Sequence, residues 1–287
     1  MKKTILMVFT LLMLVGCSTK GYSNISNGDD VIFKGPDSSY TKADLYKQLK
    51  VASEASIEND ILNKIAKNLN IDLSEVEKEA DEMIETYKSM GYEQTIIAYY
   101  GSIESFKQLF IYSGVLTKLS ESYIEDNFAK LVEDDKPVKM QMASFENKET
   151  AEKFCSDIKD EGHTFEAAAA DNGYNQECQI AVYLDSDNLP INVKSYLNTT
   201  ADTGLSSLIV STTTSQDANG NINNKDTYYV LNIASRNIDE FADEYKEKKL
   251  SSLNEEIVKN YMFNNHEIKF YDQDIYEIMK AQYEVFK

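Results

Sequence analysis

Apolar and polar residues alternate in the middle of the chain, whereas apolar residues recur at helical spacing on both sides of it. Residues 138–142 change from apolar to polar at every position, and this period of two predicts a strand with one buried face. Residues 205–210 and 228–233 predict two more strands, joined by a long polar loop around Asn219 and Gly220. The middle of the chain is therefore expected to contain a sheet.

Short helices are predicted between these strands. Asn147 is a suitable N-cap for a helix that ends near Gly162, because the apolar residues between them recur three and four positions apart. Residues 165–170 predict one further turn of helix, and Pro190 is placed to begin another. Together with the strands, these helices predict an α/β module.

The chain before the module is predicted to be helical throughout. Residues 41–128 contain no strand-like alternation, and we expect four helices there, the third around residues 102–112 and the fourth over residues 115–128. Two pairs have the spacing of capping boxes, which satisfy free amide groups at the start of a helix: Thr41 with Asp44, and Ser74 with Glu77. After the module, residues 238–261 predict one long helix and residues 272–286 a final one.

The first residues have the pattern of a bacterial lipoprotein signal. Lys2 and Lys3 precede a short apolar run, and Leu14-Val15-Gly16-Cys17 matches a lipobox. We therefore expect Cys17 to carry the lipid. Several acyl chains on Cys17 would hold the protein stably on the extracytoplasmic face of the cell membrane. The polar residues that follow predict a flexible tether.

These patterns divide the chain into five segments. We expect a signal peptide, a tether, an N-terminal helical arm, the α/β module and C-terminal helices, with the bounds 1–16, 17–39, 40–136, 137–236 and 237–287. Because helical segments enclose the module, their ends are expected to pack together. The predicted fold class is α+β: a mostly helical lobe, built from the N- and C-terminal segments, with an inserted α/β domain.

Charge excludes some classes of partner. The chain has a formal net charge of −19, which becomes −21 when Lys2 and Lys3 leave with the signal peptide, and the acidic residues are spread along the whole sequence. Nucleic acid and anionic lipid both require basic patches, so neither is expected to bind.

Candidate catalytic and metal-binding residues are sparse. His163 and His266 are the only histidines, and their spacing fits neither a metal site nor a catalytic site, so we expect turn or surface positions, no metal and no cofactor. Cys155 and Cys178 remain after lipidation, and a disulfide, a buried thiol and a loop thiol are open alternatives for them. Carboxylate pairs such as Asp134-Asp135 receive no catalytic role in so acidic a chain.

Several phrases resemble parvulin-type peptidyl-prolyl isomerases. Val138-Lys-Met-Gln-Met-Ala-Ser-Phe resembles the first parvulin strand, Gly162-His-Thr-Phe-Glu-Ala-Ala-Ala the family's G-x-x-F-x-x-x-A step, and Tyr228-Tyr-Val-Leu-Asn-Ile the closing strand. Outside the module, residues 40–50 and 268–276 resemble the helical arms of PrsA-type extracytoplasmic foldases, relatives of the SurA chaperones. The resemblance implies a parvulin-like domain inserted into a helical chaperone lobe.

Two positions depart from the family pattern. Active parvulins carry one histidine on the first strand and another on the closing strand, and here Met142 and Tyr229 stand at those positions. Rotation about a prolyl amide faces a barrier of roughly 18–20 kcal/mol, which a pocket lowers by twisting and desolvating the bond. The resemblance thus implies a lipid-anchored foldase or holdase for unfolded, newly exported polypeptides, with a module that is weak or inactive as an isomerase.

Other functions stay open. One alternative is genuine prolyl cis-trans isomerisation, which would be sensitive to changes at Met142 or Tyr229. A solute-binding lipoprotein is disfavoured, because it needs repeated βαβ patterns that are missing from the start of the chain. The tyrosines and methionines beside the aliphatic stripes, such as Tyr99 and Tyr100, are expected mostly in the core. A chaperone would use some of them as an adaptable client surface, most naturally in a groove between lobe and module. Homodimerisation by arm exchange is compatible with a helical lobe.

Overall fold

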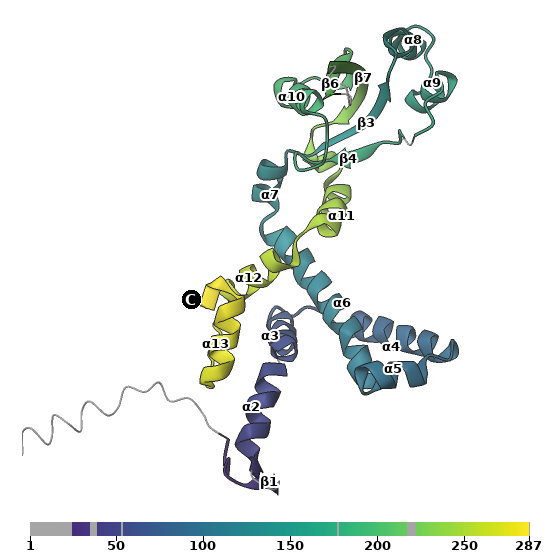
Figure 1. The fold of residues 1–287 in the computed structure, drawn as a ribbon. Coiled ribbons are helices and arrows are strands. Elements are labelled where there is room, and N and C mark those ends of the chain that lie inside the picture. Colours follow the sequence, from purple (N-terminus) through teal and green to yellow (C-terminus); the bar gives the residue numbers. More distant parts are fainter. Residues whose placement is uncertain (1–24, 35–38, 53, 177, 217–221, 287) are drawn as a thin grey trace, which may run out of the picture. The chain divides into compact units, whose positions relative to one another are not determined.

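The computed structural model describes residues 25–34, 39–52, 54–176, 178–216 and 222–286, and Cys17 lies outside them (Figure 1). The chain forms two compact units. The helical unit combines the described residues up to Tyr123 with those from Asn254 onward, and the sheet unit is Ile124–Leu253. The predicted class, α+β with a helical lobe built from both ends of the chain, is confirmed.

The helical unit begins with a two-stranded antiparallel hairpin, which lies mostly within the segment predicted as a tether. None of the described helices is long and apolar enough to cross a membrane. The elements of the unit are β1 (Val31–Lys34), β2 (Ser39–Thr41), α2 (Lys42–Ala52), α3 (Glu54–Asn68), α4 (Ser74–Ser89), α5 (Glu93–Tyr100), α6 (Ile103–Asp126), α12 (Glu255–Asn265), α13 (Gln273–Gln282) and a 3₁₀ turn, Glu284–Phe286.

One of the two predicted capping boxes is confirmed. The Thr41 amide donates to Asp44 Oδ2 at 2.9 Å, and the Asp44 amide donates to Thr41 Oγ1 at 3.3 Å. The second prediction is wrong, because Ser74 is already the first residue of α4 and its amide is accepted by Asp72 Oδ1 at 2.9 Å. Asp72 therefore takes the role that spacing assigned to Ser74.

Helix lengths also differ from the prediction. The third and fourth predicted helices are one helix, α6, and the separate α5 precedes it. The single long helix predicted over residues 238–261 is a 3₁₀ turn, Ile238–Glu240, followed by α11 (Ala242–Ser252) and α12. Asn254 caps α12 by accepting the Glu256 amide at 2.8 Å, so a new helix starts where the apolar spacing suggested continuity.

The sheet unit is an antiparallel sheet with helices on both faces (Figure 1). Its strand order is β4-β3-β7-β5, and β6 also pairs with β7. The elements are α7 (Phe128–Asp135), β3 (Val138–Phe145), α8 (Lys148–Lys159), α9 (Phe165–Asp171), β4 (Ala181–Tyr183), α10 (Ile191–Thr199), β5 (Gly204–Leu205), β6 (Ile209–Gln216), β7 (Ile222–Ser235), the 3₁₀ turn Ile238–Glu240 and α11.

Strand β3 is buried on both faces, which corrects the prediction of one buried face. Phe145 packs with Phe154 of α8 on one face, and Met140 packs with Val193 of α10 on the other. Gln141 is consequently buried and fully hydrogen-bonded. Its Nε2 donates to Glu166 Oε1 at 2.6 Å and to the Cys178 carbonyl at 3.2 Å, and its Oε1 accepts from Asn232 Nδ2 at 2.8 Å.

The hairpin of β6 and β7 extends into the predicted polar loop. Residues 211–216 pair with residues 222–227, so these positions are strand. Cross-strand hydrogen bonds join the polar side chains, from Thr212 Oγ1 to Asp226 Oδ1 at 2.6 Å and between Thr214 and Asn224 at 2.9 Å. Threonine favours an extended backbone even when both faces of the strand are exposed. Apolar–polar alternation therefore does not reveal this part of the strand. Asn219 and Gly220 lie outside the described residues.

Candidate functional site

Met142 and Tyr229 lie on the same face of the sheet. Met142 pairs with Leu231 and Ser144 pairs with Tyr229 in the register of β3 and β7, so Met142 and Tyr229 are diagonal neighbours. Both side chains are half-buried and pack against the apolar cluster on the α10 side of the sheet, which contains Val138, Met140, Val193, Ile209, Leu231 and Ile233. We call this surface the α10 face.

The α10 face has no imidazole among the described residues. His163 lies between α8 and α9, with its Nδ1 3.4 Å from Asp171 Oδ2, and His266 ends α12 in the helical unit. The sequence predicted turn or surface positions for both; His163 lies in the segment between two helices, and His266 is half-buried at a helix end. Met142 and Tyr229 contribute a thioether and a phenol ring to the apolar contacts of this face.

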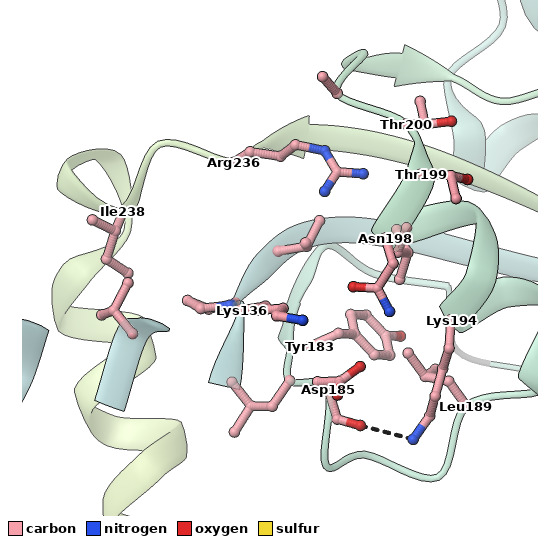
Figure 2. Close-up of a pocket in the computed structure, with 16 residues that line it drawn as sticks. Lys136, Tyr183, Asp185, Leu189, Lys194, Asn198, Thr199, Thr200, Arg236 and Ile238 are labelled. Carbon is pink, nitrogen blue, oxygen red and sulfur yellow. Dashed lines mark hydrogen bonds between the residues drawn. The ribbon is translucent and has the colours of Figure 1, made fainter. Parts of the chain in front are cut away.

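A cavity of about 550 Å³ adjoins the α10 face, where β3 begins (Figure 2). Val138, Leu189 and Leu197 line it and also belong to the packing of the α10 face. Three cationic side chains line it as well, those of Lys136, Lys194 and Arg236. In Figure 2 the ends of Lys136 and Arg236 extend into this cavity.

The position of Lys136 is fixed by the end of α7. Lys136 has a left-handed backbone, with φ +44°, which non-glycine residues rarely adopt. The preceding Asp135 is buried, forms an ion pair with Lys249 at 2.7 Å and accepts from Tyr245 Oη at 2.8 Å. Its carbonyl accepts the Asp185 amide at 2.8 Å, so Asp135 joins α7, α11 and the chain after β4. Burial, together with the hydrogen bond to Asp135, raises the pKa of Tyr245.

The other two cations come from α10 and the end of β7. Lys194 Nζ donates to the Asp185 carbonyl at 2.7 Å (Figure 2). Arg236 directly follows β7, and its Nε and Nη2 atoms are buried with no hydrogen-bond partner in the described part of the chain. Burial lowers the pKa of Arg236. The sequence analysis did not predict this cluster. The one signal for it was that Arg236 is the only arginine in the chain.

Cys155 and Cys178 are free thiols in the structure. Cys178 is buried and Cys155 is half-buried, and both pack into the cluster beneath α8 and α9. Burial raises the pKa of each thiol. Within the described ranges, no three His, Cys, Asp or Glu side chains are grouped so that they could hold a metal ion.

A second cavity, of about 990 Å³, lies in the helical unit beside a buried carboxylate. Glu58 of α3 is 7% exposed and accepts from Tyr112 Oη at 2.5 Å, from Tyr283 Oη and from Lys259 Nζ at 2.7 Å. Burial favours a raised pKa for Glu58, but these three donors outweigh it and lower the pKa. Glu58 therefore joins the N-terminal helices to the C-terminal segment of the unit.

Several solved structures of PrsA proteins are similar to this chain. The foldase protein PrsA from Streptococcus pneumoniae is 18% identical, with 87% of this chain and 98% of that chain covered and a TM-score of 0.43. The peptidylprolyl isomerase PrsA from Bacillus cereus is 14% identical, with 91% and 100% covered and a TM-score of 0.47. PrsA from Bacillus subtilis is 16% identical, with 88% and 99% covered and a TM-score of 0.35.

The chain is similar in structure to PrsA-type foldases. The sequence phrases in both flanks and in the module resemble the same family. No family model and no curated protein matches the sequence.

Proposed function

We propose that the protein is a lipid-anchored extracytoplasmic chaperone that holds unfolded, newly exported polypeptides, and that its parvulin-like module is weak or inactive as an isomerase. The resemblance of the sequence to PrsA-type foldases motivates the proposal. Capture follows mass action: transient burial of apolar segments removes them from aggregation, and dissociation returns them to folding.

Exposed apolar side chains in the helical unit carry this proposal. They belong to α5 and to the turn before it, and we call them the 90–100 surface: Met90, Tyr92, Ile97, Tyr99 and Tyr100. Tyr99 is 82% exposed and Met90 is 64% exposed. Ile96 anchors α5, because it packs with Ile84 and Phe106. Exposed apolar patches mark interaction sites, and methionine and tyrosine adapt to varied partners.

Substitution on the 90–100 surface tests the proposal. The double variant Met90→Ser, Tyr99→Ser should suppress aggregation of an unfolded client less well, while its thermal midpoint stays unchanged because both side chains are exposed. Ile222→Ser is the matched control, since Ile222 is 70% exposed on the β6–β7 hairpin. Unchanged suppression by the double variant, or an equal loss in the control, would contradict the proposal.

The α10 face supports weak or absent isomerisation. Met142 and Tyr229 pack into the apolar cluster. By the family resemblance, they stand where active parvulins carry two imidazoles. The alternative, an active isomerase, requires residual catalysis that responds to Met142→Ala or Tyr229→Phe. Catalysis at the background rate in the unaltered protein would exclude that alternative.

The anchor at Cys17 is the remaining part of the proposal, and the lipobox supports it. Replacement by Cys17→Ser should abolish incorporation of labelled fatty acid and release the protein from the membrane fraction. Lipid labelling that persists in the Cys17→Ser variant would place the anchor elsewhere.

A further inference from the structure

The single arginine of the chain lies at the cavity of the sheet unit with one edge unpaired. The edge formed by Nε and Nη2 is the side of a guanidinium that donates to both oxygens of a carboxylate. In Arg236 both atoms are buried, and neither has a hydrogen-bond partner in the described part of the chain. Leaving a buried cationic donor unpaired is costly, so this arrangement fits a site that an anion completes.

Arg236 shares its cavity with two lysines in an otherwise acidic protein, and the groups that act electrostatically on its guanidinium are Tyr196 and Asp202. Lys136 and Lys194 line the same cavity. Over the described residues, no carboxylate lies within ion-pair distance of Lys136, Lys194 or Arg236, whereas the half-buried Lys249 and Lys259 each have a carboxylate partner. Asp185 also lines the cavity, but the bond to Lys194 comes from its carbonyl oxygen, and its own carboxylate is exposed.

The rest of the cavity wall is mixed, with the polar side chains of Asn198, Thr199 and Thr200 beside apolar ones. Val138, Leu184, Leu197 and Ile238 contribute to its walls beside the cations. Its volume of about 550 Å³ falls within the roughly 300–1,000 Å³ of sites that bind small ligands. A carboxylate next to an aliphatic side chain would satisfy both the unpaired guanidinium edge and the apolar walls.

We propose that this cavity binds the carboxylate of a polypeptide segment, with Arg236 Nε and Nη2 each donating to one oxygen and Lys136 and Lys194 adding positive charge. Two sources share this chemistry, the carboxylate at a chain terminus and that of an Asp or Glu side chain. The polypeptide nature of the ligand rests on the proposed function. The recognition of a carboxylate by Arg236 does not depend on that function.

Three dye-labelled peptides separate these sources in a fluorescence-anisotropy titration of the chain lacking residues 1–17. They are Ala-Ala-Leu with a free carboxyl terminus, the same peptide as its amide, and Ala-Glu-Leu amide. The free acid should bind about tenfold or more tightly than its amide, because the amide cannot accept two charged hydrogen bonds. Binding restored in Ala-Glu-Leu amide would extend the site to acidic side chains, and binding confined to the free acid would restrict it to chain termini.

Variants at the cavity test the assignment of Arg236. Arg236→Lys keeps the charge but lacks the forked edge, so free-acid binding should weaken about tenfold or more, and Arg236→Gln should abolish the preference for acid over amide. The thermal midpoint of Arg236→Gln should not fall, because the substitution removes a buried unpaired cation. Lys225→Gln, on the exposed hairpin, is the control.

Acid and amide that bind the unaltered protein equally, or not at all, would overturn the proposal. Unchanged acid preference in Arg236→Lys and Arg236→Gln would do the same. If these variants fail to fold, Lys194→Gln should still weaken free-acid binding and reduce its salt dependence, and no effect there would contradict the proposal. Acid-selective binding without suppression of client aggregation would mean that the holdase proposal fails while the carboxylate site stands.

Discussion

At the scale of single residues, Glu58 is a buried polar side chain that connects distant segments of the helical unit. It is buried and accepts from Tyr112, Tyr283 and Lys259. Glu58→Gln leaves Lys259 without its counter-charge, and breaking such a buried pair costs about 3–5 kcal/mol of unfolding free energy. Urea unfolding at neutral pH measures this loss. Asp60→Asn, which breaks an exposed pair with Lys64 on the same helix, should cost less than about 1 kcal/mol.

The lowered pKa of Glu58 also predicts how stability depends on pH. A carboxyl group whose pKa is lower in the folded state contributes its stability above the unfolded value of 4.5 and loses it as pH falls through the folded value. The free energy of unfolding of the unaltered protein should therefore fall more steeply on acidification below pH 4.5 than that of Glu58→Gln. Parallel acid profiles for the two proteins would show that Glu58 does not carry this dependence.

At the scale of elements, Gly114 determines how closely α6 and α4 approach. A Cβ at residue 114 would lie 2.4 Å from Val76 Cγ1. In an exposed helix, Gly→Ala raises the free energy of unfolding by roughly 0.5–1 kcal/mol. A decrease on Gly114→Ala would therefore indicate a clash with Val76. We expect Gly114→Ala to lower the unfolding free energy by about 1–3 kcal/mol through overpacking.

Two variants check this explanation for Gly114. Ser113→Ala, at the exposed neighbouring position of α6, should be neutral or slightly stabilising. In the double variant Val76→Ala, Gly114→Ala, the loss should be smaller than the sum of the two single losses, because a smaller side chain at residue 76 makes room for the new methyl group. Additive losses would mean that the two helices do not meet at these atoms.

Elements with a strong local signal were predictable from the sequence, and elements set by tertiary packing were not. Asn147 caps α8 as expected, because its Oδ1 accepts the Thr150 amide at 3.1 Å. The continuity of α6 through Gly114 depends on contact with Val76, which no local pattern records. Alternation predicted a solvent face for Gln141, but α8 and α9, the latter supplying Glu166, make that face an interior.

In the candidate site, too, some features could be predicted from the sequence and others depend on tertiary packing. The family resemblance singled out Met142 and Tyr229 on the first and closing strands, and the register of β3 and β7 places them on one face. The cationic cavity could not be predicted, because Lys136, Lys194 and Arg236 come from three segments that meet only in the folded sheet unit.

At the scale of the whole molecule, the division into two units predicts a selective effect of truncation. Ending the chain after Leu253 removes Lys259 and Tyr283, which pair with Glu58, but removes no residue of the sheet unit. Hydrogen exchange of α3 should become much faster, while exchange of β3 and β7 should stay slow. Equal loss of protection in both units would contradict independent folding of the sheet unit.

The central claim is that the protein holds unfolded chains without catalysing prolyl isomerisation. The most direct measurement follows two clients side by side with protein lacking residues 1–17: refolding of a client limited by a proline step, and aggregation of a client with no such step. The account predicts suppressed aggregation and an unchanged rate of proline-limited refolding. Refolding that accelerates in proportion to the protein concentration would contradict it, because Met142 and Tyr229 would then stand in a working isomerase site.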